Sequence, residues 1–154
     1  MSIVLVTHDR EEALSMSDRV ALLFDGVLHQ VGTPQTVYHR PANMQVADYF
    51  GNCVYIAGTV ANGRFSAPGI CCPAQVADGA YQIMLRADCL DTGTEGSYRL
   101  TVEEISFRGM DTLVSFRAAE GTVWKKAYSG RVPWTVGELI SAGLTVEEPV
   151  LFSL

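Results

Sequence analysis

His8 is the side chain near the start of the sequence that is best suited to chemistry. It follows the apolar residues 3–6 and Thr7, and it precedes Asp9 and the polar stretch 10–13 (REEA). A neutral or protonated imidazole can hydrogen-bond a phosphoryl group and stabilise the charge that develops there during transfer. A lone histidine in a turn more often has only a structural role, so the surroundings of His8 must decide between these two interpretations.

The residues on either side of His8 predict a strand that leads into a helix. The apolar, β-branched run predicts a strand over residues 2–7. Asp9 has the character of a helix N-cap, and Glu12, three residues later, completes a capping box for a helix that extends to about Ser17. This order places His8 at the carboxyl edge of a sheet, where open α/β sheets bind ligands. We expect the rest of that sheet to lie upstream of this chain.

The remainder of the first 51 residues predicts a hairpin and two short helices. Two apolar runs, 19–24 and 27–31, flank Asp25-Gly26, which is a strong signal for a tight turn. Thr33 and Pro34 suit the N-cap and first position of a short helix that ends before Pro41. A further helix is predicted over residues 42–50, with Val46, Tyr49 and Phe50 on one side and a stop at Gly51.

The sequence changes character after Gly51, where we place a domain boundary. Helical periodicity gives way to short apolar runs separated by glycines, which predict strands at 54–60, 63–66, 81–85, 98–107, 112–118, 122–128 and 149–153. Glu104 interrupts the alternation of the fourth of these strands, 98–107, so a bulge or bend is expected there. The predicted fold class is therefore mainly β: a small β-barrel or sandwich over residues 52–154, preceded by an α/β segment over residues 1–51.

Composition and charge limit the classes of function. The net charge of −6 argues against general nucleic-acid binding, which requires a basic surface. No apolar run approaches the roughly 20 residues of a membrane span, and no signal peptide is evident. The four cysteines, Cys53, Cys71, Cys72 and Cys89, have no metal-site spacing, so we expect buried or half-buried free thiols and no metal site. These features suit a cytoplasmic location.

Several other groups admit a functional and a structural interpretation. Trp124, Lys125 and Lys126, with Arg131 and Trp134, could form a stacking platform for nucleic acid, but a solvated strand with its aromatic side chain in the core fits the acidic composition better. The adjacent acidic pairs at 103–104 and 147–148 are expected on strands, where their members point to opposite faces and cannot act together. His29 and His39 are expected to have packing or surface roles.

Six ordered blocks in the first 51 residues resemble the C-terminal end of the ATP-binding subunit of ABC-type importers, in the subgroup that serves sugars, polyamines, iron or oxyanions. The blocks are 6–14 (VTHDREEAL), 17–20 (SDRV), 25–26 (DG), 30–34 (QVGTP), 40–43 (RPAN) and 46–51 (VADYFG). Their order and spacing make the resemblance specific.

The second half resembles, more loosely, the accessory TOBE domain of the same subgroup, which is an oligonucleotide-binding-type (OB-like) β-barrel. The matching segments are 85–88 (LRAD), 102–109 (VEEISFRG), 112–114 (TLV), 136–138 (VGE) and 150–152 (VLF). Ala87 stands where the family usually has proline. The resemblance thus implies an ATPase-domain remnant over 1–51 and a regulatory barrel over 52–154.

The resemblance gives His8 a specific role. It matches the family's switch histidine, which contacts the γ-phosphate of ATP beside a glutamate base. The family's phosphate loop (GxxxxGK[ST]), its Leu-Ser-Gly-Gly-Gln signature and its Asp-Glu strand end are absent from these 154 residues. We therefore expect a segment of a longer transport ATPase: the parent protein would use ATP and magnesium, whereas this segment holds no cofactor and is inactive alone.

The resemblance also implies partners and a location. The parent subunit would lie in the cytoplasm, bound to the inner face of the membrane through permease subunits, and would form a homodimer in which the barrel mediates contacts and sometimes binds a small ligand. The predicted strand at the N-terminus would be an unpaired edge, so we expect it either to pair with another copy, which would also give a homodimer, or to be disordered. The alternative function is a stand-alone β-barrel module for ligand sensing or dimerisation. The transported solute and the roles of Cys71 and Cys72 have no readable signature.

Overall fold

The computed structural model describes residues 1–154, which divide into two compact units, Met1–Gly51 and Asn52–Leu154. Each unit has a hydrophobic core of its own. The chain is mainly β, with a small β-barrel-like domain as its larger unit, so the predicted fold class is confirmed.

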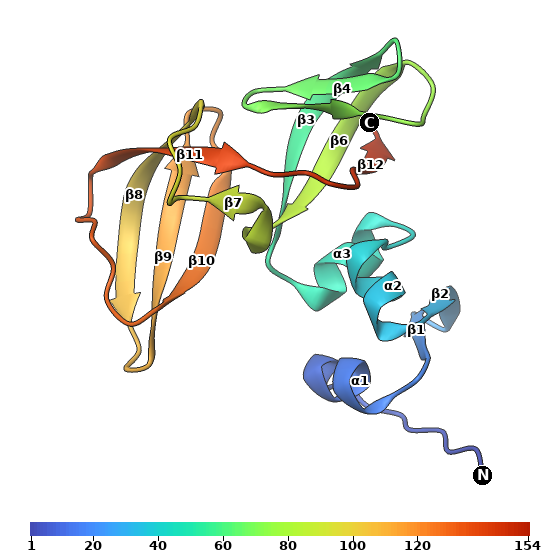
Figure 1. The fold of residues 1–154 in the computed structure, drawn as a ribbon. Coiled ribbons are helices and arrows are strands. Elements are labelled where there is room, and N and C mark those ends of the chain that lie inside the picture. Colours follow the sequence, from blue (N-terminus) through green and yellow to red (C-terminus); the bar gives the residue numbers. More distant parts are fainter. The chain divides into compact units, whose positions relative to one another are not determined.

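The first unit contains three short helices and one hairpin. Its elements are α1 (Arg10–Met16), β1 (Val20–Phe24), β2 (Val27–Gly32), α2 (Pro34–His39) and α3 (Met44–Phe50) (Figure 1). Asp25 and Gly26 both have positive φ, 50° and 76°, as a two-residue hairpin turn of the favoured mirror type requires. Val37 and Val46 are fully buried in the core between the hairpin and the helices.

All three helices begin at a side-chain cap, which explains their boundaries. The side chains of Asp9, Thr33 and Asn43 each accept a hydrogen bond from the backbone N–H three residues later. The predicted caps at Asp9 and Thr33 are confirmed. The third helix begins at Met44 rather than at residue 42 because Asn43 is its cap, and it ends at Phe50, followed by Gly51 with a φ of 70°.

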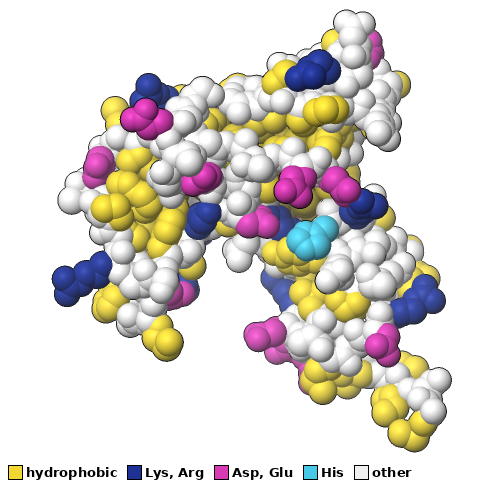
Figure 2. Space-filling view, viewed as in Figure 1, with side chains coloured by type: hydrophobic (Ala, Val, Ile, Leu, Met, Phe, Trp, Pro, Cys, Tyr) yellow, Lys and Arg dark blue, Asp and Glu magenta, His cyan; other side chains and the backbone are white.

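The strand predicted over residues 2–7 does not form. Residues 1–7 have no strand pairing, and the only sheet of this unit is the β1–β2 hairpin. Ile3, Val4 and Val6 are 78%, 90% and 89% exposed, and Figure 2 shows hydrophobic side chains on the surface at this end of the chain. An apolar run becomes a strand only when another strand satisfies its backbone groups, and this unit offers none.

The second unit contains two five-stranded sheets built from ten strands. The first follows the order β10-β9-β8-β11-β7 and the second β12-β6-β3-β4-β5, with antiparallel pairing throughout (Figure 1). The strands are β3 (Cys53–Ala61), β4 (Arg64–Ala67), β5 (Ile70–Pro73), β6 (Gly79–Arg86), β7 (Leu90–Asp91), β8 (Tyr98–Phe107), β9 (Asp111–Ala118), β10 (Val123–Ser129), β11 (Leu139–Leu144) and β12 (Val150–Ser153), with a 3₁₀ turn η1 (Ala87–Cys89).

One core joins the two sheets of this unit. Phe65 on β4, Phe116 on β9 and Trp124 on β10 are its largest fully buried side chains. The pairing of β8 with β9 shifts register between Val102 and Glu104, so the bulge predicted at Glu104 is confirmed. None of the helices in either unit combines the length and the apolar content that a membrane span requires.

Candidate functional site

His8 lies in the short loop that joins the extended segment 1–7 to α1. Its side chain is exposed, and the helix cap begins at the next residue. Asp9 Oδ1 accepts a hydrogen bond from the Glu12 N–H at 2.8 Å, and the Asp9 carbonyl accepts from the Ala13 N–H at 3.1 Å. The backbone on the C-terminal side of His8 is therefore fixed by the first turn of the helix.

Thr7 fixes the backbone on the other side of His8. Its hydroxyl donates to Glu12 Oε2 at 2.6 Å and accepts from the Asp9 N–H at 3.0 Å. In an ordinary capping box the glutamate would accept directly from the cap residue's N–H. Here Thr7 stands between the two groups, so one hydroxyl connects the residue before His8 with the residue after it and with the helix.

Tyr49 contacts the same loop from α3. Its hydroxyl donates to the carbonyl oxygen of His8 at 3.5 Å, and the guanidinium carbon of Arg10 lies 5.2 Å from the centre of its ring. The ring in turn packs against Phe24, at 5.5 Å between centroids, and against Phe50 at 5.2 Å. Sequence reasoning assigned Tyr49 only to the apolar side of its helix, and no local signal links it to a residue 41 positions away.

These contacts hold the backbone of His8 while its ring remains accessible. The contacts described above involve the His8 carbonyl or the residues next to His8 in the chain. The imidazole itself forms no hydrogen bond with the rest of the chain. A ring held in this way can donate to or accept from a group that another molecule brings to it. The geometry therefore suits an imidazole that acts on an external ligand.

The other two histidines have packing contacts. His29 Nδ1 lies 3.1 Å from Asn43 Nδ2, and its ring meets Phe24 edge-on at 5.0 Å. The ring of His39 packs edge-on against Tyr38, also at 5.0 Å. Both observations agree with the structural roles expected for them.

The basic and aromatic residues near β10 do not form a stacking platform. Trp124 is 1% exposed, and its Nε1–H donates to the Tyr98 hydroxyl at 3.2 Å. Trp134 is half-buried and packs on Tyr128 at 5.2 Å. The Lys126 ammonium donates to the Leu90 carbonyl. Because Trp124 faces the core, this segment matches the solvated strand with a core aromatic rather than a nucleic-acid surface.

The acidic pairs are likewise not catalytic pairs. Glu103 and Glu104 on β8 are both exposed, and Glu103 forms an ion pair with Arg117 on β9. Glu147 and Glu148 lie in the connection between β11 and β12, so the expectation that they occupy a strand is wrong. No group of three or more His, Cys, Asp or Glu side chains is arranged to hold a metal ion.

All four cysteines are free thiols in different environments. Cys72 is buried, and this burial is the main reason that its pKa is raised; burial also raises the pKa of the half-buried Cys89. Cys71 is exposed, which differs from the expected burial, and its sulfur accepts from Arg64 Nη2 at 3.2 Å. Neighbouring residues of a strand face opposite sides, so Cys71 points outward where Cys72 points inward.

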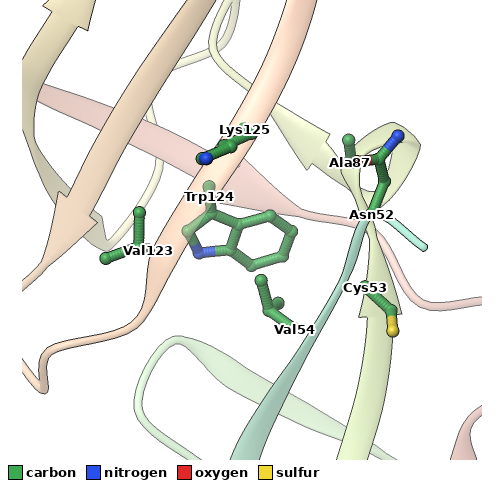
Figure 3. A pocket seen from close by; sticks show the side chains of 7 residues that line it. All are labelled: Asn52, Cys53, Val54, Ala87, Val123, Trp124 and Lys125. Atoms are coloured by element: carbon green, nitrogen blue, oxygen red, sulfur yellow. The ribbon is translucent and has the colours of Figure 1, made fainter. Parts of the chain in front are cut away.

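The second unit also contains one small pocket. It has a volume of about 260 Å³ and is lined by residues from the start of β3, from η1 and from β10: Asn52, Cys53, Val54, Ala87, Val123, Trp124 and Lys125. Figure 3 shows the Trp124 indole beside Val54 and Val123. The lining is thus apolar with a polar side chain, Asn52, and a cationic one, Lys125, which is a composition that small-molecule sites share.

Comparison with known proteins shows similarity to one class. No protein-family model matches the chain. The chain is 34% identical over 137 residues to the spermidine/putrescine import ATP-binding protein PotA 1 of Pseudomonas aeruginosa, a match covering 80% of this chain and 37% of that protein. It is 35% identical over 121 residues to the sulfate/thiosulfate import ATP-binding protein CysA of Caulobacter vibrioides, covering 77% of this chain and 35% of that one.

A third relative carries a different solute in its name. The Fe(3+) ions import ATP-binding protein FbpC 2 of Rhodococcus jostii is 31% identical over 121 residues, covering 77% of this chain and 35% of the relative. The chain therefore spans little more than a third of the length of these relatives. Its homologues share the description of import ATP-binding proteins and differ in what they import.

Proposed function

Because the homologues of this chain are ATP-binding subunits of ABC importers, we propose that it is the part of such a subunit that carries the switch histidine and the accessory β domain. The observation that carries the proposal is the His8 loop. An exposed imidazole follows an apolar segment and stands directly before a capped helix, with its backbone held on both sides.

In this proposal His8 acts on the γ-phosphate of ATP. The ring donates a hydrogen bond to a γ-phosphate oxygen and stabilises the negative charge that builds up as the phosphoryl group is transferred to water. Magnesium, when bound with the nucleotide, neutralises charge on the β- and γ-phosphates. The 154 residues contain no phosphate loop, so in this proposal the groups that cradle the phosphates come from other parts of the subunit.

The second unit is proposed to be the TOBE-type regulatory domain. It has a hydrophobic core of its own, as an accessory domain that folds as a separate unit requires. In the whole subunit it would support a homodimer. Permease subunits would hold that dimer at the cytoplasmic face of the membrane, and ATP hydrolysis would drive solute import. The proposal covers import in general and no single solute, because the relatives' names give spermidine/putrescine, Fe(3+) ions and sulfate/thiosulfate.

A chimera tests the catalytic part of the proposal. This chain replaces the matching stretch of the Pseudomonas relative, and ATP hydrolysis is measured. We expect an active chimera that loses about 10²–10³-fold in kcat on His8→Ala, the size expected for one donor to a developing charge. His39→Ala, at a histidine that only packs on Tyr38, is the matched control and should leave kcat unchanged. A folded chimera without ATPase activity, or one whose kcat does not change on His8→Ala, would contradict the proposal.

The chain alone should neither bind nor hydrolyse ATP. Calorimetric titration of this chain with ATP and magnesium should give no binding signal, because the groups that cradle the phosphates are absent from its sequence. Clear saturable binding would mean that the chain has a nucleotide site of its own, and the assignment of His8 to a composite site would then fail.

The second candidate function is a stand-alone ligand-sensing module. The pocket of about 260 Å³ favours it, since its lining comes entirely from the second unit. A thermal-shift screen of small anions and polyamines separates the two functions. A ligand that stabilises this chain, with the effect abolished by Lys125→Gln at the pocket rim, would favour the sensor; no shift with any ligand would remove the reason for it.

A further inference from the structure

We propose that Tyr49 is a positioning residue for His8: it holds the switch loop in place from α3 without touching the nucleotide. This inference rests on the proposed function of His8. Its starting point is the hydrogen bond that the Tyr49 hydroxyl donates to the His8 carbonyl at 3.5 Å, which joins residues 41 positions apart in the sequence.

The Tyr49 contact complements those made by Thr7 and Asp9. Thr7 and Asp9 connect the loop to α1, which itself meets the core of the first unit through the partly buried Leu14. Tyr49 belongs to α3, whose Val46 and Phe50 are buried in the core of the first unit. The Tyr49 hydrogen bond links the loop directly to this core element, so Tyr49 helps to fix where the loop lies relative to the core.

Arg10 strengthens this connection. Its guanidinium lies 5.2 Å from the centre of the Tyr49 ring, within the range of a cation–π interaction. A Cβ added at Gly51 would lie 3.2 Å from Arg10 Nη1, so the same guanidinium also closely approaches the end of α3. Arg10 is the first residue of α1 and follows His8 by two positions. The loop and the start of α1 thus approach α3 at two points, through the His8 carbonyl and through the Arg10 guanidinium.

The Tyr49 side chain is itself held in a defined orientation. Its ring packs against Phe24 of β1 at 5.5 Å and against Phe50, which is 8% exposed, at 5.2 Å. A ring constrained by aromatic neighbours loses little conformational freedom when its hydroxyl donates a hydrogen bond. Phenylalanine at this position would keep these ring contacts and the contact with Arg10, and would lose only the hydrogen bond.

Amide hydrogen exchange of this chain tests the positioning directly. In Tyr49→Phe we expect the amides of Asp9 and Glu12, which the loop contacts protect, to exchange roughly two- to tenfold faster, as loss of one net hydrogen bond allows. The Val46 amide of α3, bonded to Asn43, should be unchanged. Tyr38→Phe removes a hydroxyl from the same unit, at a ring that packs on His39 and Phe50, and should leave the Asp9 amide unaffected.

The chimera described above tests the consequence for catalysis. Tyr49→Phe should lower kcat by about threefold or more, because a misplaced catalytic group loses rate. The KM for ATP should stay within about a factor of two, since the proposed role of Tyr49 acts through the His8 backbone and not on the nucleotide. A merely structural role would not produce this division between kcat and KM, and Tyr38→Phe should change neither.

The outcomes separate the inference from the function on which it rests. If His8→Ala leaves the chimera fully active, the proposed function fails, whatever Tyr49→Phe does to exchange. If His8→Ala abolishes activity while Tyr49→Phe alters neither the Asp9 exchange rate nor kcat, the positioning role is wrong and the role of His8 stands. Faster exchange with unchanged kcat would also reject the positioning role.

Discussion

The Thr7 hydroxyl donates to the Glu12 carboxylate at 2.6 Å, which closes the loop that carries His8 onto the first turn of α1. The same hydroxyl accepts from the Asp9 N–H. Helix α1 has seven residues and no fully buried side chain, although its Leu14 is partly buried against the core of the first unit. Isolated helices of this length are unstable in water. The polar contacts that order the His8 loop therefore also stabilise the first turn of α1.

Thr7→Val should weaken α1 and loosen the His8 loop. Valine keeps the shape of threonine but neither donates to Glu12 nor accepts from Asp9, and loss of such a capping contact costs about 1 kcal/mol. The carbon chemical shifts of residues 10–16 should move toward coil values. Thr7→Ser, which retains the hydroxyl, is the matched control and should keep the helical shifts. Equal helicity in Thr7→Val and the wild type would show that α1 does not need this hydroxyl.

The sequence predicts the contacts of the candidate site that lie within one helical turn, but not the contact that Tyr49 makes from far along the chain. Asp9 as a cap and Glu12 as its partner lie within one helical turn, so their spacing alone predicts their contact. The hydrogen bond between Tyr49 and His8 depends on how the hairpin and α3 fold back on α1. The spacing of residues along a single sequence does not predict a contact between positions 41 residues apart. The capping-box motif also does not predict that the Thr7 hydroxyl lies between the Asp9 N–H and the Glu12 carboxylate.

The same contrast applies to the strands. The 10 residues of β8 were predicted with their bounds because apolar and polar residues alternate there. The sequence did not predict strands β5, β7 and β11. Strand β7 has only two residues, and β5 contains Pro73. Strand β11 contains Ala142 and Gly143, which are poor strand formers. They form because neighbouring strands pair with them. The converse error at residues 2–7 arose because an apolar run without a partner strand does not pair.

Gly58→Ala should destabilise the second unit. A Cβ at Gly58 on β3 would lie 2.4 Å from the Ser66 carbonyl oxygen and 2.5 Å from the Phe65 ring, which is fully buried. Overpacking against backbone and a buried ring costs about 1–3 kcal/mol or more. Gly79→Ala is the control, since the nearest atom to its added Cβ is 3.5 Å away. Urea unfolding should show a loss for Gly58→Ala alone; equal midpoints for the two variants would contradict the close approach.

Tyr98 should make the second unit sensitive to alkaline pH. Burial first, and then its hydrogen bond to Glu120, raise the pKa of this phenol above its ordinary value of 10.0. The folded state therefore holds the proton more tightly than the unfolded state. This contribution to stability is complete below pH 10 and is lost as the pH rises beyond it, at up to about 1.4 kcal/mol per pH unit.

The comparison with Tyr98→Phe isolates this effect from the other groups that titrate in alkali. The variant is less stable at neutral pH, because Trp124 and Glu120 lose their partner. Its free energy of unfolding should nevertheless fall less steeply than that of the wild type between pH 10 and 11. Urea unfolding at a series of pH values measures both slopes, and parallel curves would mean that the Tyr98 phenol is not held protonated by the fold.

Alkylation should distinguish the neighbouring thiols Cys71 and Cys72. Cys71 is exposed on β5, whereas Cys72 is 5% exposed and has a pKa raised mainly by burial, so less of it is thiolate near neutral pH. With iodoacetamide at pH 8 and detection by mass spectrometry, we expect Cys71 to react about tenfold or more faster than Cys72. Cys71→Ser should remove the fast phase, and in urea the remaining thiols should react at similar rates. Equal rates for Cys71 and Cys72 in the native protein would show that β5 does not hold one thiol outward and the other in the core.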